Sequence, residues 1–155
     1  MEGKIDSTYF GFSVGIIDVA LPVHNILKVV PLPQLKYLPN LPDCVIGLLN
    51  YHGEVFPIFD LRIKFKLTER KISITQNILL GEVDDFKFGI LTTKIIGNIE
   101  KNEQHLITDK RIKTDSSEIG NFINHKDDFV YVCDPLKFLL PEEKENLSSI
   151  LKKDD

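Results

Sequence analysis

The chain has 155 residues, the usual length of one domain. Hydrophobic residues make up 43% and charged residues 27%, which is ordinary for a soluble protein that buries its own core without disulfide or metal staples. The formal net charge of −4 disfavours nucleic acid as a partner, because a duplex attracts a clustered lysine and arginine surface.

Short apolar runs separated by Gly, Pro and Asp dominate the first half of the chain and predict β-strands. The first three runs cover residues 10–14, 19–23 and 26–30. Prolines at positions 31, 33, 39 and 42 then forbid a long helix and predict an irregular crossing. Two further predicted strands, 45–49 and 55–59, flank a turn at His52 and Gly53. Pro57 places the second of them at a sheet edge or a bulge.

The second half continues the same pattern. Runs 74–82 and 86–91 predict a hairpin that turns at Asp84 and Asp85. Another strand is expected at 95–99, and the polar segment 100–118 is predicted to be a surface loop. Runs 119–123 and 129–133 form the last predicted pair, joined around His125 and Asp127.

Only the C-terminal segment has the features of a helix. It opens with Pro141 and two glutamates and ends with Lys152 and Lys153, which suits the polarity of the helix dipole. Many short strands at close spacing predict an all-β sandwich or small barrels and disfavour βαβ units.

One pattern occurs twice. Residues 55–65 and 129–139 each contain a β-rich run, then an aspartate, then a segment compatible with a helical turn. Asp60 and Asp134 are predicted N-caps, because a carboxylate accepts hydrogen bonds from the unpaired amides of the next turn. Pro135 follows at the first helical position, where its missing N–H costs nothing. The repetition indicates two related half-structures.

The motifs of common enzyme classes are absent from the sequence. It has no Gly-rich phosphate loop, no H-E-x-x-H, no G-x-S-x-G and no cysteine pair at metal-binding spacing. The histidines lie far apart, so no metal and no cofactor is expected, and a composite site built from distant loops is the alternative. The carboxylate pairs are explained by turn and cap roles: Asp84–Asp85, Asp127–Asp128 and Glu142–Glu143.

The sequence also predicts a soluble, cytoplasmic protein. No stretch approaches about 20 consecutive apolar residues, so no insertion into a membrane is expected. The polar segment from Met1 to Tyr9 has no apolar core of signal-peptide length. Cys44 and Cys133 lie in apolar stretches and are predicted to be buried free thiols.

The central segment, residues 47–62 (GLLNYHGEVFPIFDLR), resembles the signature of CheW-like domains. In that family the pattern runs G-[hydrophobic]-x-N-x-R-G-x-[hydrophobic]-x-P-[hydrophobic]-x-D-L-R. Residues 20–30 are similar to the family's second and third strands. Segments 88–91 and 130–140 resemble its later strands and closing helical turn.

This resemblance implies an all-β fold of two small five-stranded β-barrels (SH3-like or OB-like subdomains) packed around a shared hydrophobic layer, with a short C-terminal helix. It divides the chain into a tail (1–8), a CheW-like domain (9–140) and a C-terminal helix and tail (141–155). It further implies a non-catalytic adaptor of bacterial chemotaxis, associated with membrane receptor arrays. One face would bind the regulatory domain of a histidine kinase, and a groove would bind the cytoplasmic helical hairpin of a chemoreceptor.

The resemblance also assigns candidate interface residues. The kinase-interface candidates are Ile26, Lys28, Val29 and Gly47. The receptor-interface candidates are Asn50, His52 and Gly53. Ile26 and Val29 are predicted on opposite faces of their strand, so one of them would be exposed. The two glycines also have backbone roles, a close approach and a turn, and Asn50 is expected to bond its own loop.

Three departures from the family pattern bear on the partner. His52 replaces an arginine, Lys28 replaces a commonly acidic residue, and residues 92–95 (TTKI) replace V-D-x-V. Histidine lacks the permanent charge and fork of arginine, and a reversed charge can reject a partner. One alternative is therefore a CheW-like module of another kinase pathway. A small β-barrel enzyme is the other, and it would need His24 or His52 in a cleft beside a carboxylate.

Overall fold

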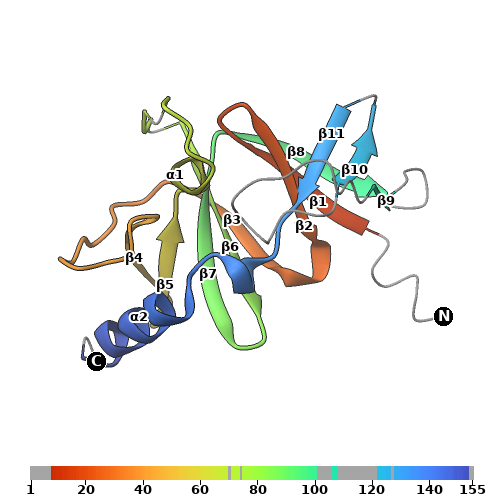
Figure 1. Cartoon of the computed structure of the whole chain (residues 1–155). Helices are drawn as coiled ribbons and strands as arrows, with labels where there is room; N and C mark the ends of the chain where they lie inside the picture. Colours follow the sequence, from red (N-terminus) through yellow and green to blue (C-terminus); the bar gives the residue numbers. More distant parts are fainter. Residues whose placement is uncertain are drawn as a thin grey trace.

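A computed structural model describes residues 8–69, 71–73, 75–100, 106–107, 122–126 and 128–153 (Figure 1). The described residues are mostly strands, as the sequence predicts. These are β1 (Thr8–Val14), β2 (Ile17–Pro22), β3 (Ile26–Pro31), β4 (Val45–Tyr51), β5 (Glu54–Phe59), β6 (Asn77–Val83), β7 (Phe86–Thr92), β8 (Lys94–Glu100), β9 (Leu106–Ile107), β10 (Phe122–His125) and β11 (Asp128–Val132). The helices are α1 (Leu61–Lys64) and α2 (Pro141–Lys153), with 3-10 turns η2 (Val23–Asn25) and η4 (Pro135–Lys137).

The strands form two sheets, which Figure 1 shows side by side. The first has six strands in the order β8-β1-β2-β11-β10-β9, and the second has five in the order β3-β6-β7-β5-β4. The prediction of two five-stranded barrels is corrected in two respects: neither sheet closes on itself within the described residues, and β9 adds a sixth strand to the first. A two-residue strand is too short to produce a pattern in the polar segment that contains it.

The two sheets have equivalent topology, which confirms the two related half-structures. In the first, β8–β1–β2 is antiparallel, β11 joins β2 in parallel, and β10 joins β11 antiparallel. In the second, β3–β6–β7 is antiparallel, β5 joins β7 in parallel, and β4 joins β5 antiparallel. The two repeated aspartates follow β5 and β11, the strand that makes the parallel pair in each sheet.

Three packed clusters explain why the strands assemble this way. One cluster takes a buried side chain from each of β1, β2, β8, β10 and β11, and lies within the first sheet: Tyr9, Ala20, Ile99, Ile123 and Val130. A second, centred on Phe56, Ile58, Ile78 and Leu80, lies within the other sheet. The third draws on both sheets and includes Phe12, Leu21, Phe59 and Phe88. We call this third cluster the shared layer, as the family resemblance predicts, and its burial joins the two sheets.

Several predicted boundaries shift. The strand predicted at 74–82 begins at Asn77, after residue 74, which lies outside the described residues. Most of the predicted loop 100–118 and the start of the strand predicted at 119–123 also lie outside them. The turn at Asp84 and Asp85 is confirmed, because both residues have positive φ angles, 47° and 68°. The predicted C-terminal helix is confirmed as α2.

The prediction that Pro57 marks a sheet edge or a bulge is wrong, because Pro57 lies in β5, an inner strand, and the register irregularity of the β4–β5 pair lies between Val45 and Gly47. The parallel pairing between β5 and β7 joins Ile58 to Gly89 and Phe59 to Ile90, so it begins only after Pro57. No residue of β7 pairs with Pro57, so no backbone N–H is needed on that side. The proline is therefore compatible with an inner strand. Among the described residues, no helix combines the length and apolar character needed to cross a bilayer.

Candidate interaction surface

The turn between β4 and β5 is a two-residue hairpin loop. Tyr51 pairs with Glu54, and the two residues between them, His52 and Gly53, have φ angles of 54° and 85°. Positive φ at both central positions defines a type I′ turn, whose twist suits the flanking strands. The side-chain oxygen of Asn50 accepts a hydrogen bond from the Gly53 amide at 3.1 Å, so the expected loop role of Asn50 is confirmed.

Tyr51 connects two residues that the resemblance assigns to different interfaces. The His52 ring meets the Tyr51 ring edge-on, with ring centroids 4.2 Å apart, and Lys28 Nζ lies 5.8 Å from the Tyr51 centroid. This second contact is a cation–π geometry. We call Lys28, Tyr51 and His52 the Tyr51 cluster. Tyr51 has no distinctive sequence signal as a site residue, because an aromatic residue in a strand is usual.

The Tyr51 cluster also shows how strongly the second sheet curls. Lys28 is on β3 and Tyr51 is on β4, the two outer strands of that sheet. A backbone bridge between Lys36 and Leu48 further ties the segment after β3 to β4. The sheet therefore approaches a barrel, although no ladder joins β3 directly to β4 in the part of the chain that the structure describes.

The predicted opposite orientation of Ile26 and Val29 is wrong. The register of β3 against β6 shifts between Ile26 and Lys28, which indicates a bulge at Leu27. The extra residue reverses the alternation, so both Ile26 and Val29 pack against the shared layer. The exposed apolar residue is Leu27, with 54% of its surface accessible. A bulge leaves no simple trace in an apolar run, so sequence reasoning missed Leu27.

Gly47 has a structural role. A Cβ at this position would lie 2.8 Å from Leu35 Cβ and 3.2 Å from the Lys36 carbonyl oxygen. The segment that follows β3 covers Gly47, and the predicted close backbone approach is confirmed. Gly53 differs, since no atom lies within 4 Å of its hypothetical Cβ and it is exposed at the turn.

Both predicted caps are confirmed. Asp60 accepts a hydrogen bond from the Arg62 amide, and Asp134 accepts one from the Leu136 amide, each at 3.0 Å. Asp60 also holds the Arg62 side chain, with Nε–Oδ1 at 2.9 Å and Nη2–Oδ2 at 3.0 Å. Arg62 Nη1 donates to the Lys71 carbonyl at 3.1 Å, so the guanidinium also secures the segment after α1.

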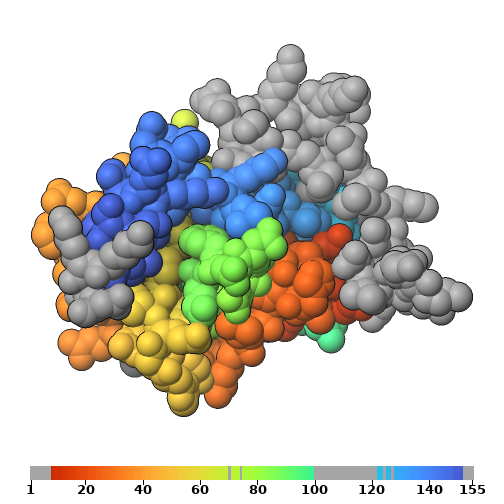
Figure 2. Space-filling model, turned by 90° about the horizontal axis from the view of Figure 1, so that it is seen from below, coloured from red at the N-terminus to blue at the C-terminus, as the bar shows by residue number. Residues whose placement is uncertain are grey.

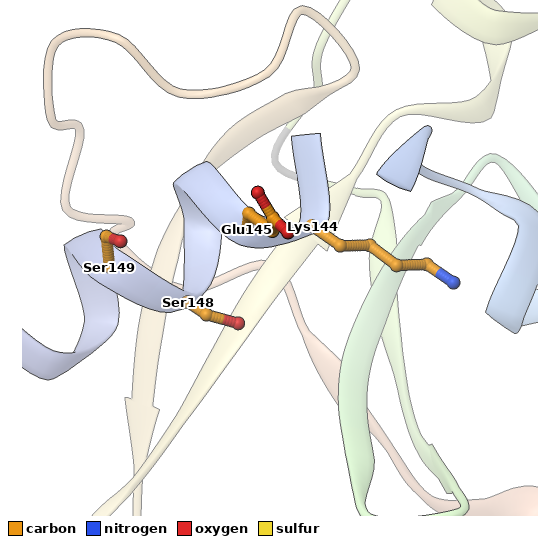
Figure 3. Close-up of a pocket in the computed structure, with 4 residues that line it drawn as sticks. All are labelled: Lys144, Glu145, Ser148 and Ser149. Carbon is orange, nitrogen blue, oxygen red and sulfur yellow. The ribbon is translucent and has the colours of Figure 1, made fainter. Parts of the chain in front are cut away.

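The alternative of a metal-dependent enzyme calls for a cluster of metal-ligating side chains. Among the described residues, no cluster of three or more His, Cys, Asp or Glu side chains is placed to hold a metal ion. Figure 3 shows one shallow hollow, on the exposed side of α2, lined by Lys144, Glu145, Ser148 and Ser149. His24 and His52 are exposed and lie outside it. Cys44 and Cys133 are buried free thiols, as predicted.

Comparisons with known proteins agree on one family. The family model of the CheW-like domain matches residues 8–143. The chemotaxis protein CheW of Helicobacter pylori is 38% identical over 63 residues, covering 41% of this chain and 38% of that protein. Protein FrzA of Myxococcus xanthus is 25% identical over 96 residues, 62% of this chain and 60% of FrzA. The alignments thus span less than two thirds of these two relatives.

Two longer matches extend the likeness. The chemotaxis protein CheW of Treponema pallidum is 21% identical over 145 residues, 90% of this chain and 85% of that protein. The scaffolding protein TtCheW of Thermoanaerobacter tengcongensis has the same fold, with a TM-score of 0.75 at 18% identity. That likeness covers 88% of this chain and 90% of TtCheW.

Proposed function

Because this chain belongs to the CheW-like domain family, we propose that it is a non-catalytic adaptor that couples chemoreceptors to a histidine kinase in chemotaxis. The observation that carries the proposal is the family match over residues 8–143, together with relatives named as chemotaxis proteins. An adaptor needs surfaces rather than reactive groups, and the described residues offer exposed apolar and charged surface on a rigid pair of sheets. Two weak interfaces on one rigid body raise effective concentration and fix relative geometry.

The proposed kinase-binding surface is centred on the Tyr51 cluster. Lys28 and His52 are exposed, and Leu27 beside Lys28 presents an apolar side chain to solvent. Leu27 beside Lys28 suits a partner surface that has a hydrophobic pocket with carboxylates around it. Ile26 and Val29 are partly buried and Gly47 is buried, so these three residues contribute mainly by shaping this surface.

The proposed receptor-binding surface adjoins it at the tip of the β4–β5 hairpin. His52 and Gly53 are exposed there, while Asn50 fixes the turn through the Gly53 amide. A helical hairpin from a chemoreceptor's cytoplasmic tip would meet this turn. His52 lies at the receptor-binding turn and also contacts Tyr51 of the kinase-binding surface. Binding of the kinase would therefore alter the environment of His52 that the receptor meets. The adaptor would act at membrane receptor arrays through these contacts.

A calorimetric titration tests the proposal. The protein is titrated with the regulatory domain of the chemotaxis kinase of its own organism, and separately with the receptor's cytoplasmic hairpin. Binding with a Kd on the order of micromolar supports the coupling role. The variants Lys28→Glu and His52→Arg restore the family's usual charges, and Lys137→Glu is the charge-matched control at an exposed position in η4.

The outcomes separate two functions. If the native chain binds the kinase domain and Lys28→Glu weakens binding while Lys137→Glu does not, the adaptor function and its surface are supported. If only Lys28→Glu or His52→Arg binds, the chain serves a kinase pathway other than the chemotaxis one. The exposed lysine at position 28 is the observation that favours this second candidate. Absence of binding by every variant to both partners contradicts the adaptor proposal.

A further inference from the structure

The C-terminal helix α2 is held to the rest of the protein by very few buried side chains. Among residues 141–151, for which the structure describes burial, Leu147 is the one that is almost fully buried, with 3% of its surface accessible. Ile150 and Leu151 are partly buried. The residues of the intervening turns, including Lys144, Glu145, Ser148 and Ser149, are exposed. The helix therefore contacts the fold along one narrow apolar stripe with a spacing of three to four residues.

The segment just before α2 is anchored far more firmly. Phe138 and Leu139 are buried, and the Phe138 ring packs against Phe59 with centroids 5.1 Å apart. The Phe138 carbonyl accepts hydrogen bonds from Lys64 Nζ at 3.2 Å and from Cys44 Sγ at 3.9 Å. Leu140, the next residue, is 55% exposed. The continuous run of buried residues before α2 thus ends at Leu139.

The surface beneath α2 is apolar. Leu147 and Leu151 belong to the shared layer together with Leu38, Leu41 and Cys44. Burial raises the pKa of the Cys44 thiol to about 11, and the negative charge of Glu143 in the first turn of α2 adds to that rise. Figure 2 shows α2, in blue, between the orange segment that contains these residues and the green β6–β7 hairpin.

We propose that α2 is a displaceable cover seated on a helix-binding surface at Leu38, Leu41 and Cys44, and that a partner's amphipathic helix with apolar side chains four residues apart takes its place. The occupant has the chemistry that α2 itself shows, a narrow apolar stripe with polar residues on the remaining faces. A single buried leucine gives α2 a weak hold, so a partner helix with a second full anchor displaces it. This inference does not depend on the kinase or the receptor.

Thiol alkylation tests the cover in the full-length chain. The native protein and the Leu147→Asp variant are exposed to iodoacetamide under native conditions, and labelling of Cys44 and Cys133 is followed separately by peptide mass spectrometry. We expect Leu147→Asp to accelerate Cys44 labelling about tenfold or more while Cys133 labelling stays unchanged. Leu147→Met, which conserves volume and apolarity, is the matched control and should label like the native chain.

The two thiols distinguish local from global opening. Cys133 donates to the Ala20 carbonyl within the sheet core, and no charge on α2 affects its pKa. Equal acceleration at both cysteines would mean that Leu147→Asp unfolds the whole protein. That result, or unchanged labelling of Cys44, overturns the proposal.

A peptide in trans tests the helix-binding surface. A synthetic peptide with the sequence of residues 141–153 is added in excess to the Leu147→Asp variant. We expect it to slow Cys44 labelling again, whereas the same peptide with aspartate in place of both leucines has no effect. Protection by neither peptide, with Cys44 exposed, would show that the surface does not accept a helix and would overturn that part of the inference.

Discussion

The carboxylate of Asp60 and the guanidinium of Arg62 form an enclosed ion pair, in which each side chain retains only 3% of its accessible surface. The two parallel contacts, at 2.9 Å and 3.0 Å, give the bidentate geometry that arginine makes with carboxylates. Asp60 also caps α1, and Arg62 also binds the Lys71 carbonyl. The Asp-Leu-Arg end of the central motif is thus a structural unit, in which the Asp60–Arg62 ion pair stabilises the fold.

We expect Arg62→Ala to lower the free energy of unfolding by about 3–5 kcal/mol, because it leaves the Asp60 carboxylate buried without a counter-charge. The double variant Asp60→Asn/Arg62→Ala should recover part of this loss, since asparagine still caps α1 and carries no charge. Lys71→Ala is the control, because the carbonyl that Arg62 binds remains. Urea unfolding followed by circular dichroism measures all three. A double variant less stable than Arg62→Ala would contradict the argument.

Substitution of Gly53 should destabilise the hairpin turn only through the backbone conformation, because a new side chain there meets no other atoms. Gly53→Ala places a Cβ in open space, yet the φ of 85° is unfavourable for alanine. We expect a loss of about 1 kcal/mol from backbone strain. Gly89→Ala provides the contrast, because its Cβ would clash with Ile58 Cδ1, a steric rather than a conformational cost. If Gly53→Ala is as stable as the native chain in thermal unfolding, the turn is not type I′ in solution.

Lys28 should affect binding much more than folding. Its contact with the Tyr51 ring at 5.8 Å is at the surface, and such a cation–π contact contributes about 0.5–1 kcal/mol. We therefore expect Lys28→Met to change the free energy of unfolding by less than about 1 kcal/mol. Tyr51→Leu removes the same contact from the other side and tests its size. A larger loss for Lys28→Met than for Tyr51→Leu would show that Lys28 has another structural role.

The buried thiols make the fold less stable at alkaline pH. Burial raises the pKa of Cys44 from 9.0 to about 11 and that of Cys133 to about 12. The unfolded chain ionises both thiols near 9, whereas the folded chain keeps them neutral, so their contribution is complete below about pH 9 and is lost as pH rises toward the folded pKa. At pH values above the folded pKa of Cys133, the free energy of unfolding falls by about 4 kcal/mol because of this thiol.

Comparison of the native chain with Cys133→Ala isolates this effect from the titration of lysines and tyrosines. Urea unfolding at about pH 7 and about pH 10.5 should show a smaller alkaline loss for the variant. Equal losses in both proteins would contradict the assignment to the Cys133 thiol.

The caps and turns were predictable from the sequence because they depend on a few neighbouring residues. Asp60, Asp134 and the aspartates at 84 and 85 each act within two or three positions of the chain, so residue type alone indicates their role. The repeated strand–Asp–turn pattern was likewise sufficient to predict two related halves. The pattern marks β5 and β11, and the structure shows that these strands are equivalent in their sheets.

The surface was less predictable, because its exposure depends on pairing between distant strands. The register shift at Leu27 moves Ile26 and Val29 to the same side, and that shift is set by β6 rather than by β3 alone. Burial of Arg62 is unusual for an arginine, and it depends on Asp60, which compensates the charge in the interior. Lys28 and Tyr51 are brought together only by the curl of the second sheet.

The sheet order also constrains how this chain acquires its structure during synthesis. The strands of the second sheet, β3 to β7, are consecutive, so that sheet is able to assemble as soon as its own segment leaves the ribosome. The β1–β2 hairpin emerges earlier, but its neighbours β8 and β11 come last. Until then both long edges of this hairpin lack their native strands and are open to pairing with another chain. The period of greatest aggregation risk therefore falls between translation of β2 and translation of β11, and slower elongation in that interval would lengthen it.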